Sequence, residues 1–176
     1  MPTFASTSIY FANLVRGHSD LLLYLAPAIV LAVAFRYLAK RHPAFFLLYL
    51  TGTTIHEISH LVFGLLTGAR PVSLSIFPRR AAGQQWILGS VRFTNIRWWN
   101  AMFVGLAPLS TLFMPFWVAD WRTQNGLVFG WPDLAISAVL APMFISFWPS
   151  TADFKIARRS WPYMVVVGLC TWWAWR

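Results

Sequence analysis

Long apolar segments recur along the whole chain and are separated by short stretches that hold most of its charged residues. About 20 apolar residues suffice for a helix to cross a bilayer. Four segments reach or approach this length, at residues 21–38, 43–66, 98–119 and 134–148. A fifth segment, residues 161–175, is shorter, so it spans, tilts or lies in the interface. The sequence therefore predicts an all-α polytopic membrane protein with four to five transmembrane helices.

The composition also indicates a membrane protein. Only 11% of the residues are charged, whereas soluble domains carry about 25%. The 11 Trp and 15 Phe suit interfacial belts and lipid-facing surfaces. The net charge of +9 does not indicate nucleic-acid binding, because the basic residues lie between the apolar segments and not in one stripe.

We expect a single membrane-embedded domain over residues 1–176. Residues 1–20 are interpreted as an N-terminal arm, either a short interfacial helix or a loose segment. They lack the basic start of a secretory signal, so we expect no cleavable signal peptide. The one cysteine, Cys170, excludes an intrachain disulfide and a zinc site built from cysteines.

The second apolar segment contains the sequence His56-Glu57-Ile58-Ser59-His60. On a helix, histidines four residues apart share one face, so both imidazoles can reach one Zn²⁺. Glu57, the only glutamate in the chain, can then act as a general base towards water. Polar groups at this density are costly at membrane depth unless they face a protein interior or a water-filled cavity. The full motif favours a metal site over a polar seam between helices.

Residues 70–97 follow a different pattern from the apolar segments. Residues 72–77 alternate apolar and polar side chains, residues 86–93 are also strand-like, and Pro78 and Gly83 lie between them. The region predicts a β-hairpin or small sheet between the second and third transmembrane helices. The sequence leaves open whether this hairpin region binds substrate or is simply a loop.

The distribution of Lys and Arg predicts the orientation in the membrane. With these segments, nine of the 14 basic residues fall on one face and five on the other, if the last segment spans. The first face collects Arg16, Arg70, Arg79, Arg80, Arg92, Arg97, Lys155, Arg158 and Arg159. This face is expected to be cytoplasmic. The histidine pair and the end of the fourth segment fall at similar depth near it.

A catalytic zinc usually takes three protein ligands and keeps one position open. The chain has no second glutamate, and position 66, where one class of zinc proteases carries a third histidine, is Leu66. The remaining candidates are His18, His42, Asp20, Asp120, Asp133 and Asp153. Three of them map to the opposite face (His42, Asp120, Asp133), and His18 and Asp20 suit N-cap or surface roles. Asp153 remains, at the end of the fourth segment; a helix-end carboxylate paired with a nearby base is the alternative.

These features together resemble the site-2 protease family of intramembrane zinc metalloproteases. The resemblance covers roughly residues 43–159 and includes the H-E-I-S-H motif, the hairpin region and an aspartate from a later segment. Residues 104–109, Val-Gly-Leu-Ala-Pro-Leu, are also similar to a small-Gly-Pro-Leu element of that family. The resemblance implies that His56, His60 and Asp153 bind Zn²⁺ and that Glu57 is the catalytic base.

The last motif departs from the family pattern N-x-x-P-x-x-x-x-D-G. Ser146 stands in place of the Asn, the interval from Pro149 to Asp153 is one residue shorter, and Phe154 replaces the Gly. The family's Asn is thought to position the substrate or the oxyanion, so Ser146, or alternatively Asn100, becomes the candidate for that role. The departures leave an alternative function, a catalytically inactive membrane homologue that binds membrane helices or metal without cleavage.

The expected function is hydrolysis of peptide bonds in membrane-spanning substrates, with the active site towards the cytoplasmic face. A helical substrate must unwind because its scissile bond is hidden in backbone hydrogen bonds. An edge strand of the hairpin region could hold it extended. The expected partners are a transmembrane protein substrate and the lipid bilayer, whereas the oligomeric state is not predicted. A membrane-anchored protease that cuts soluble peptides is a further alternative.

Overall fold

A computed structural model describes residues 4–39, 41, 47–77, 79–80, 86–87, 89–126 and 128–176. The helices are α1 (Phe4–Ala39), α2 (Leu50–Leu66), α3 (Ala101–Gly105), α4 (Phe113–Gln124), α5 (Trp131–Leu140), α6 (Met143–Ser146), α7 (Thr151–Ala157) and α8 (Trp161–Ala174). Two 3₁₀ helices, η2 (Ala107–Leu112) and η3 (Arg158–Ser160), connect them, and a 3₁₀ turn at residues 47–49 precedes α2. The strands are β1 (Pro71–Ser75), β2 (Arg79–Arg80), β3 (Trp86–Ile87) and β4 (Ser90–Phe93). The prediction of a mostly helical chain with a small sheet after the second apolar segment is confirmed.

The first helix is longer than the predicted apolar segment. α1 runs without interruption from Phe4 to Ala39, so residues 4–20 are helical and continuous with the first segment, as one of the two alternatives for them required, and are not a loose segment. The predicted start of the second segment, at Pro43, lies outside the described residues, and α2 begins at Leu50.

The third and fourth apolar segments are each divided into shorter helices. α3 ends at Gly105, and the 3₁₀ helix that follows has Pro108 in its first turn. Proline lacks an amide hydrogen and clashes with the preceding turn, so an α-helix cannot run through it unchanged. Pro142 lies at the corresponding break between α5 and α6. The bend of 59° in the fourth segment lies further on, between Ser146 and Thr151.

Fewer described helices could cross a membrane than the sequence predicts. Ser19–Ala39 is long and apolar enough, and the pair Trp131–Ser146 and Thr151–Tyr163, bent by 59°, adds a second span if the pair is counted as one. α2 has 17 residues and is therefore about 26 Å long, short of the roughly 30 Å of a hydrocarbon core. The structure thus supports one or two candidate spans among the described residues, and the multi-pass arrangement stays a prediction.

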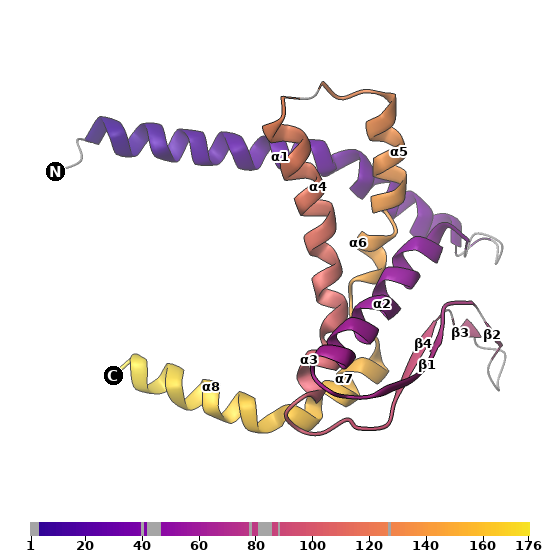
Figure 1. The fold of residues 1–176 in the computed structure, drawn as a ribbon. Coiled ribbons are helices and arrows are strands. Elements are labelled where there is room, and N and C mark those ends of the chain that lie inside the picture. Colours follow the sequence, from indigo (N-terminus) through magenta and orange to yellow (C-terminus); the bar gives the residue numbers. More distant parts are fainter. Residues whose placement is uncertain are drawn as a thin grey trace.

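The main core lies where α1 packs across α4, α5 and α6. Leu25 of α1 contacts Ala119 of α4, and Ala28 contacts Leu140 and Met143. Alanine predominates among the buried apolar side chains, so the helix backbones approach closely. In Figure 1, α4 runs between α1 at one end of the molecule and α8 at the other.

A buried ion pair joins α1, α4 and α5. Asp133 is fully buried, and its carboxylate accepts hydrogen bonds from Arg122 Nε and Nη2, each at 2.8 Å. The Tyr24 hydroxyl donates to the same carboxylate at 2.8 Å, and the Gly130 amide donates at 2.9 Å. A buried carboxylate needs this degree of pairing, because an unpaired one is strongly destabilising. Asp133 therefore has a structural role, consistent with its exclusion as a metal ligand.

The hairpin region lies beside α2 (Figure 1). α2 ends at Leu66 with Thr67 as its C-cap, Gly68 follows in a left-handed conformation at φ 68°, and the Ala69 amide donates back to the Gly64 carbonyl. β1 then pairs antiparallel with β4, with Leu74 opposite Val91 and an irregularity between Pro71 and Ser73. A second short ladder joins β2 and β3. The antiparallel pairing with β1 brings β4 back along α2, towards the histidine motif.

Candidate metal centre

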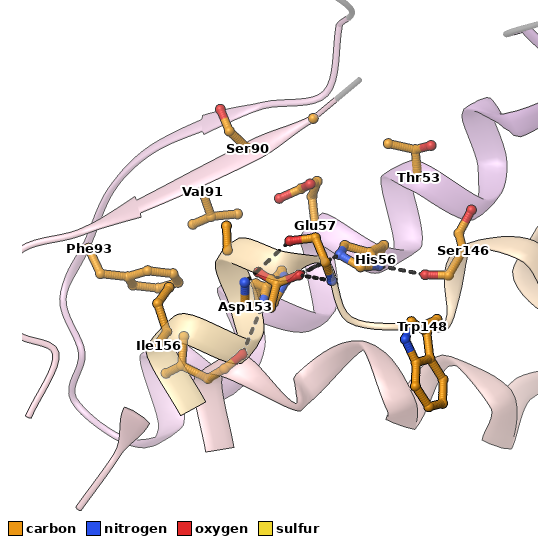
Figure 2. Close-up of a pocket in the computed structure, with 15 residues that line it drawn as sticks. Thr53, His56, Glu57, Ser90, Val91, Phe93, Ser146, Trp148, Asp153 and Ile156 are labelled. Carbon is orange, nitrogen blue, oxygen red and sulfur yellow. Dashed lines mark hydrogen bonds and ion pairs between the residues drawn. The ribbon is translucent and has the colours of Figure 1, made fainter. Parts of the chain in front are cut away.

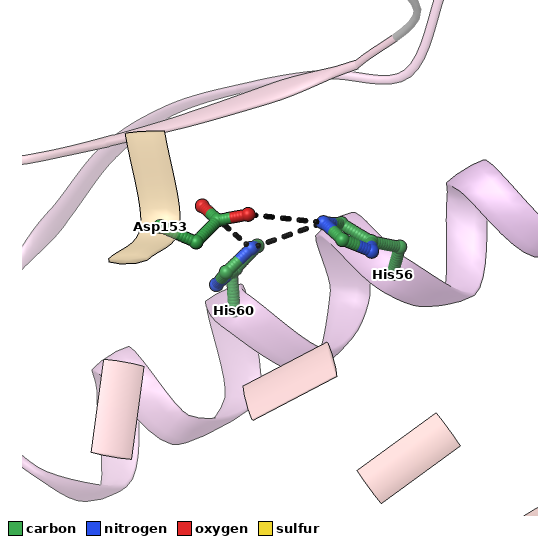
Figure 3. Close-up of side chains that lie close together, drawn as sticks. All are labelled: His56, His60 and Asp153. Carbon is green, nitrogen blue, oxygen red and sulfur yellow. Dashed lines mark hydrogen bonds and ion pairs between the residues drawn. The ribbon is translucent and has the colours of Figure 1, made fainter. Parts of the chain in front are cut away.

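Three side chains predicted as metal ligands meet between α2 and α7. The Nε2 atoms of His56 and His60 lie 3.3 Å apart. An Asp153 oxygen lies 3.2 Å from His60 Nε2, and the other lies 3.6 Å from His56 Nε2. Figure 3 shows both rings and the carboxylate pointing towards one another. The predicted grouping of these residues is confirmed, since they lie close enough to hold a metal ion.

The separations between the three donor groups suit a small tetrahedral ion. Zn–N distances of about 2.0–2.1 Å place the ligand atoms of a regular tetrahedron about 3.3–3.4 Å apart. The two Nε2 atoms lie 3.3 Å apart, and the two carboxylate distances, 3.2 and 3.6 Å, end on different oxygens of Asp153. With one ligand atom from each residue, all three atoms lie within 4.8 Å of one another. Two imidazoles and one carboxylate are also a donor set that zinc accepts. The residues present therefore fit a divalent ion of this kind.

Backbone carbonyls orient both histidines through their Nδ1 atoms. His56 Nδ1 lies 2.6 Å from the Ser146 carbonyl oxygen, and His60 Nδ1 lies 2.7 Å from the Val104 carbonyl oxygen. A carbonyl only accepts, so each Nδ1 carries the hydrogen, and each Nε2 keeps its lone pair for a metal. Partners of this kind fix the tautomer and ring orientation of metal-binding histidines. The rings are thus already arranged as ligands.

Asp153 is oriented by the start of its own helix. It is the third residue of α7, its backbone amide donates to Ser150 Oγ at 3.2 Å, and the Ser150 amide donates to Asp153 Oδ2 at 2.6 Å. This reciprocal capping box satisfies the open end of the helix and holds the carboxylate in place. Lys155 and Arg158, the alternative partners for this aspartate, form no ion pair with it in the described chain.

Glycines allow the helices that carry these groups to approach closely. A Cβ at Gly105 of α3 would lie 2.5 Å from the Asp153 carbonyl oxygen and 2.8 Å from the Ala157 nitrogen. A Cβ at Gly52 of α2 would lie 2.3 Å from the Pro142 carbonyl oxygen. Only a residue without a side chain fits at either position. Gly105 therefore sets the position of α7, and with it the position of Asp153.

The three side chains line a cavity of about 560 Å³ that also contains Glu57 (Figure 2). Glu57 is 8% exposed, His60 is 5% exposed and Asp153 is 9% exposed, so the charged groups are largely withdrawn from solvent. A Cβ at Gly89, just before β4, would lie 2.8 Å from Glu57 Oε1. The backbone at Gly89 therefore packs directly against the carboxylate of Glu57.

The two candidates for the oxyanion role occupy different places. Ser146 lines the cavity, and it is its backbone carbonyl that orients His56. Asn100 is fully buried and does not line this cavity in the described chain. Its amide donates to the Asn95 and Thr67 carbonyls, and its oxygen accepts from the Arg97 amide. Asn100 therefore shapes the loop before α3, and we do not retain it as a site residue.

Among the described residues, Asp20, Asp120 and Asp133 are not part of the metal centre. Asp20 lines a separate pocket with Tyr24 and Thr123, at the contact between α1 and α4. His42 and the side chain of His18 lie outside the described residues.

Sequence reasoning missed the carbonyls of Val104 and Ser146 and the close approaches at Gly52, Gly89 and Gly105. The glycines are visible in the sequence, but the atoms that each one faces are not.

In comparisons with known proteins, no family model, curated protein or solved structure matched the chain. The structure itself defines a mostly helical protein with one or two candidate membrane spans and a buried site of two histidines and one aspartate. A carboxylate that does not belong to this set, Glu57, lies in the same cavity.

Proposed function

We propose that this protein is an intramembrane zinc metalloendopeptidase of the site-2 protease type, which hydrolyses peptide bonds of membrane-spanning proteins. One observation carries the proposal. Two Nε2 atoms and a carboxylate from a distant helix lie close enough together to hold one metal ion, with Glu57 in the same cavity. In a polar seam between helices, nothing would require both histidines to be held in the same tautomer by backbone carbonyls.

Zn²⁺ is the ion we propose for His56, His60 and Asp153. Bound there, it supplies a Lewis acid that activates water and polarises a peptide carbonyl. The buried cavity strengthens every electrostatic interaction inside it, because little water screens them.

Glu57 is the proposed general base and acid. Its carboxylate takes a proton from the attacking water and returns it to the amine of the leaving peptide. It follows His56 directly on α2, and its side chain is turned to the β4 side of the cavity by the packing at Gly89. Ser146 lies at one end of the cavity with Thr53 (Figure 2), where hydroxyl groups suit a path for water.

The exposed surface supports a location in the bilayer. On α1, Leu23, Val30 and Val33 are 66–70% exposed, and on α8 Val167 and Trp173 are 61% and 79% exposed. Such apolar surface is costly in water and favourable against lipid. We propose a multi-pass protein with its active site towards the cytoplasmic face, where nine of the 14 basic residues would lie.

β4 is the proposed guide for an unwound substrate. Residues 89–91 and Phe93 line the cavity, whereas no residue of β1 does so in the described chain. Among the described strands β4 pairs with β1 alone, and no described strand pairs with its other edge. A substrate segment added at that edge would lie extended past the metal centre, which exposes its peptide bonds to attack.

The test is cleavage of a synthetic membrane-spanning peptide by purified protein reconstituted with zinc. Glu57→Gln should lower the cleavage rate by about 100-fold or more, because a general base contributes roughly 10²–10⁴-fold. A soluble peptide with the same cleavage sequence serves as a control and should be cut more slowly. Equal rates for wild type and Glu57→Gln would exclude Glu57 as the base. A soluble peptide cut equally well would favour a membrane-anchored protease for soluble peptides.

A non-catalytic protein is the second candidate, and the replacement of the family's Asn by Ser146 favours it. Such a protein would bind membrane helices or metal without cleavage. It predicts that wild type and Glu57→Gln bind the same peptide equally and that neither yields product.

A further inference from the structure

A second cavity of about 560 Å³ adjoins the one that holds the metal centre. The two cavities share Val91, Phe93 and Ile156 as a common wall. Figure 2 shows these three side chains together at one end of the first cavity, opposite Ser146. A chain that leaves the metal centre along β4 therefore passes directly into the second cavity.

Two arginines from different elements face this second cavity. Arg92 comes from β4 and Arg159 from η3, and both are exposed. Among the ion pairs of the described chain, neither arginine takes part in one. Apolar residues, including Val72 and Ile96, line the same cavity. The cavity thus combines positive charge with an apolar floor.

The chain itself cannot neutralise these arginines. It has only five acidic residues. Glu57 and Asp153 lie in the metal cavity, and Asp133 is paired with Arg122. Asp20 lies beside Thr123, near the end of α4 that also holds Asp120. Arg92 and Arg159 are therefore available to an acidic group of another molecule.

The spacing relates this second cavity to the site of cleavage. From Asp153 the chain advances four residues to Ala157 at about 1.5 Å each and two more in η3 at about 2.0 Å each, so Arg159 lies about 10 Å further along. An extended peptide covers about 3.3 Å per residue, so about three residues reach from the metal centre to the level of Arg159. A substrate held along β4 would place its third or fourth residue from the scissile bond beside Arg159.

We propose that the second cavity selects substrates with an acidic residue three or four positions from the scissile bond. This inference rests on the proposed function. Arg92 and Arg159 bind the carboxylate by charge-assisted hydrogen bonds, and the shared wall holds the residues in between. A peptide carboxylate is favoured over a lipid headgroup because the cavity continues from the metal centre along the same strand.

Binding to the Glu57→Gln variant tests the proposal without requiring cleavage. The probes are synthetic peptides with one Leu/Ala membrane-spanning helix and an extended tail that carries Glu, Gln or Lys at its third and fourth positions. One set has the tail before the helix, and one has it after. The protein is held in nanodiscs of uncharged lipid, and binding is followed by fluorescence polarisation. One variant combines Arg92→Glu with Arg159→Glu. The control variant is Arg176→Glu, because Arg176 is also a cation but packs over Trp172 near the end of α8.

In one of the two sets, the Glu peptide should bind about fivefold more tightly than the Gln peptide, and the Lys peptide should bind more weakly than either. The double charge reversal should invert the order, and tighter binding of the Lys peptide would show that this variant is folded. Arg176→Glu should keep the original order. No dependence on tail charge in either set, or one unchanged by the reversal, would overturn the proposal.

Two further measurements separate the remaining explanations. If the reversal lowers retention of anionic phosphatidylglycerol but leaves the peptide order unchanged, the arginines bind lipid and the proposal is wrong. Cleavage of the same peptides by the wild type separates this inference from the protease. If acidic peptides bind more tightly but no peptide is cleaved, the proposed protease function is wrong and the acidic subsite stands. If peptides are cleaved without any preference for charge, the acidic subsite is wrong and the protease function stands.

Discussion

Substitution of Gly105 by alanine should weaken zinc binding although Gly105 touches no ligand side chain. The new Cβ would lie 2.5 Å from the Asp153 carbonyl oxygen, 2.8 Å from the Ala157 nitrogen and 2.9 Å from the Ala157 Cβ. A carbon and a carbonyl oxygen normally approach to about 3.3 Å, so α7 must retreat by about 0.8 Å. The atoms in contact belong mainly to the α7 backbone, which cannot swing aside as a flexible side chain does.

That displacement is large compared with what a metal centre tolerates. Metal–ligand distances hold within about 0.2 Å, and Asp153 moves with the helix that carries it. We expect a loss of about 10–100-fold in zinc affinity, the range seen when groups that orient ligands are changed. Overpacking should also lower stability by about 1–3 kcal/mol, partly offset by the better helix propensity of alanine.

The assay is competition for zinc with a chromogenic chelator, with thermal unfolding recorded in parallel. Gly168→Ala in α8 is the matched control, because a Cβ there meets nothing within 4 Å. It should leave zinc affinity unchanged. If Gly105→Ala binds zinc within twofold of the wild type, then Gly105 does not set the position of α7, and the account of how Asp153 reaches the histidines is wrong.

Three further predictions concern the base, the ion pair and the metal. Gly89→Ala places a Cβ 2.5 Å from Glu57 Cγ and should displace the Glu57 side chain. The rate of peptide cleavage should therefore fall about 100-fold, whereas zinc should still bind. An unchanged cleavage rate would contradict the proposed position of the base. Tyr24→Phe removes one hydrogen bond from buried Asp133 and should lower the free energy of unfolding by about 1 kcal/mol, measured by denaturation, without changing zinc affinity; a change in zinc affinity would show that the two regions are coupled. Chelation of the metal should lower the thermal midpoint of the wild type by an amount that depends on free zinc, whereas Asp153→Ala should be insensitive; equal shifts would mean that the chelator acts elsewhere.

The metal ligands were accessible from sequence because their geometry is mostly local. His56 and His60 share a helix face by spacing alone, and this requires no knowledge of the rest of the fold. Asp153 emerged because acidic residues are so few that most alternatives could be set aside. The β1–β4 pair followed equally from a local signal, an alternating pattern of apolar and polar side chains.

The remaining features depend on contacts that no local pattern encodes. The carbonyls of Val104 and Ser146 belong to the backbone, which is the same at every residue, so nothing in the sequence marks them as partners of the histidines. Hydropathy predicted uninterrupted spans because it averages over a window. Pro108 and Pro142 divide two of those spans, and α1 extends to Phe4 through residues of mixed polarity. Asn100 attracted attention as an amide in the right region, yet its hydrogen bonds are all used within its own loop and α2.

Metal analysis of the purified protein tests the central claim most directly. Wild type and Asp153→Ala are prepared side by side, and the metal bound per chain is measured by mass spectrometry after exposure to limiting zinc. We predict about one zinc ion per chain in the wild type and a large loss of zinc in Asp153→Ala. A wild type without stoichiometric metal, or an Asp153→Ala variant that binds zinc as tightly, would contradict the proposed metal centre.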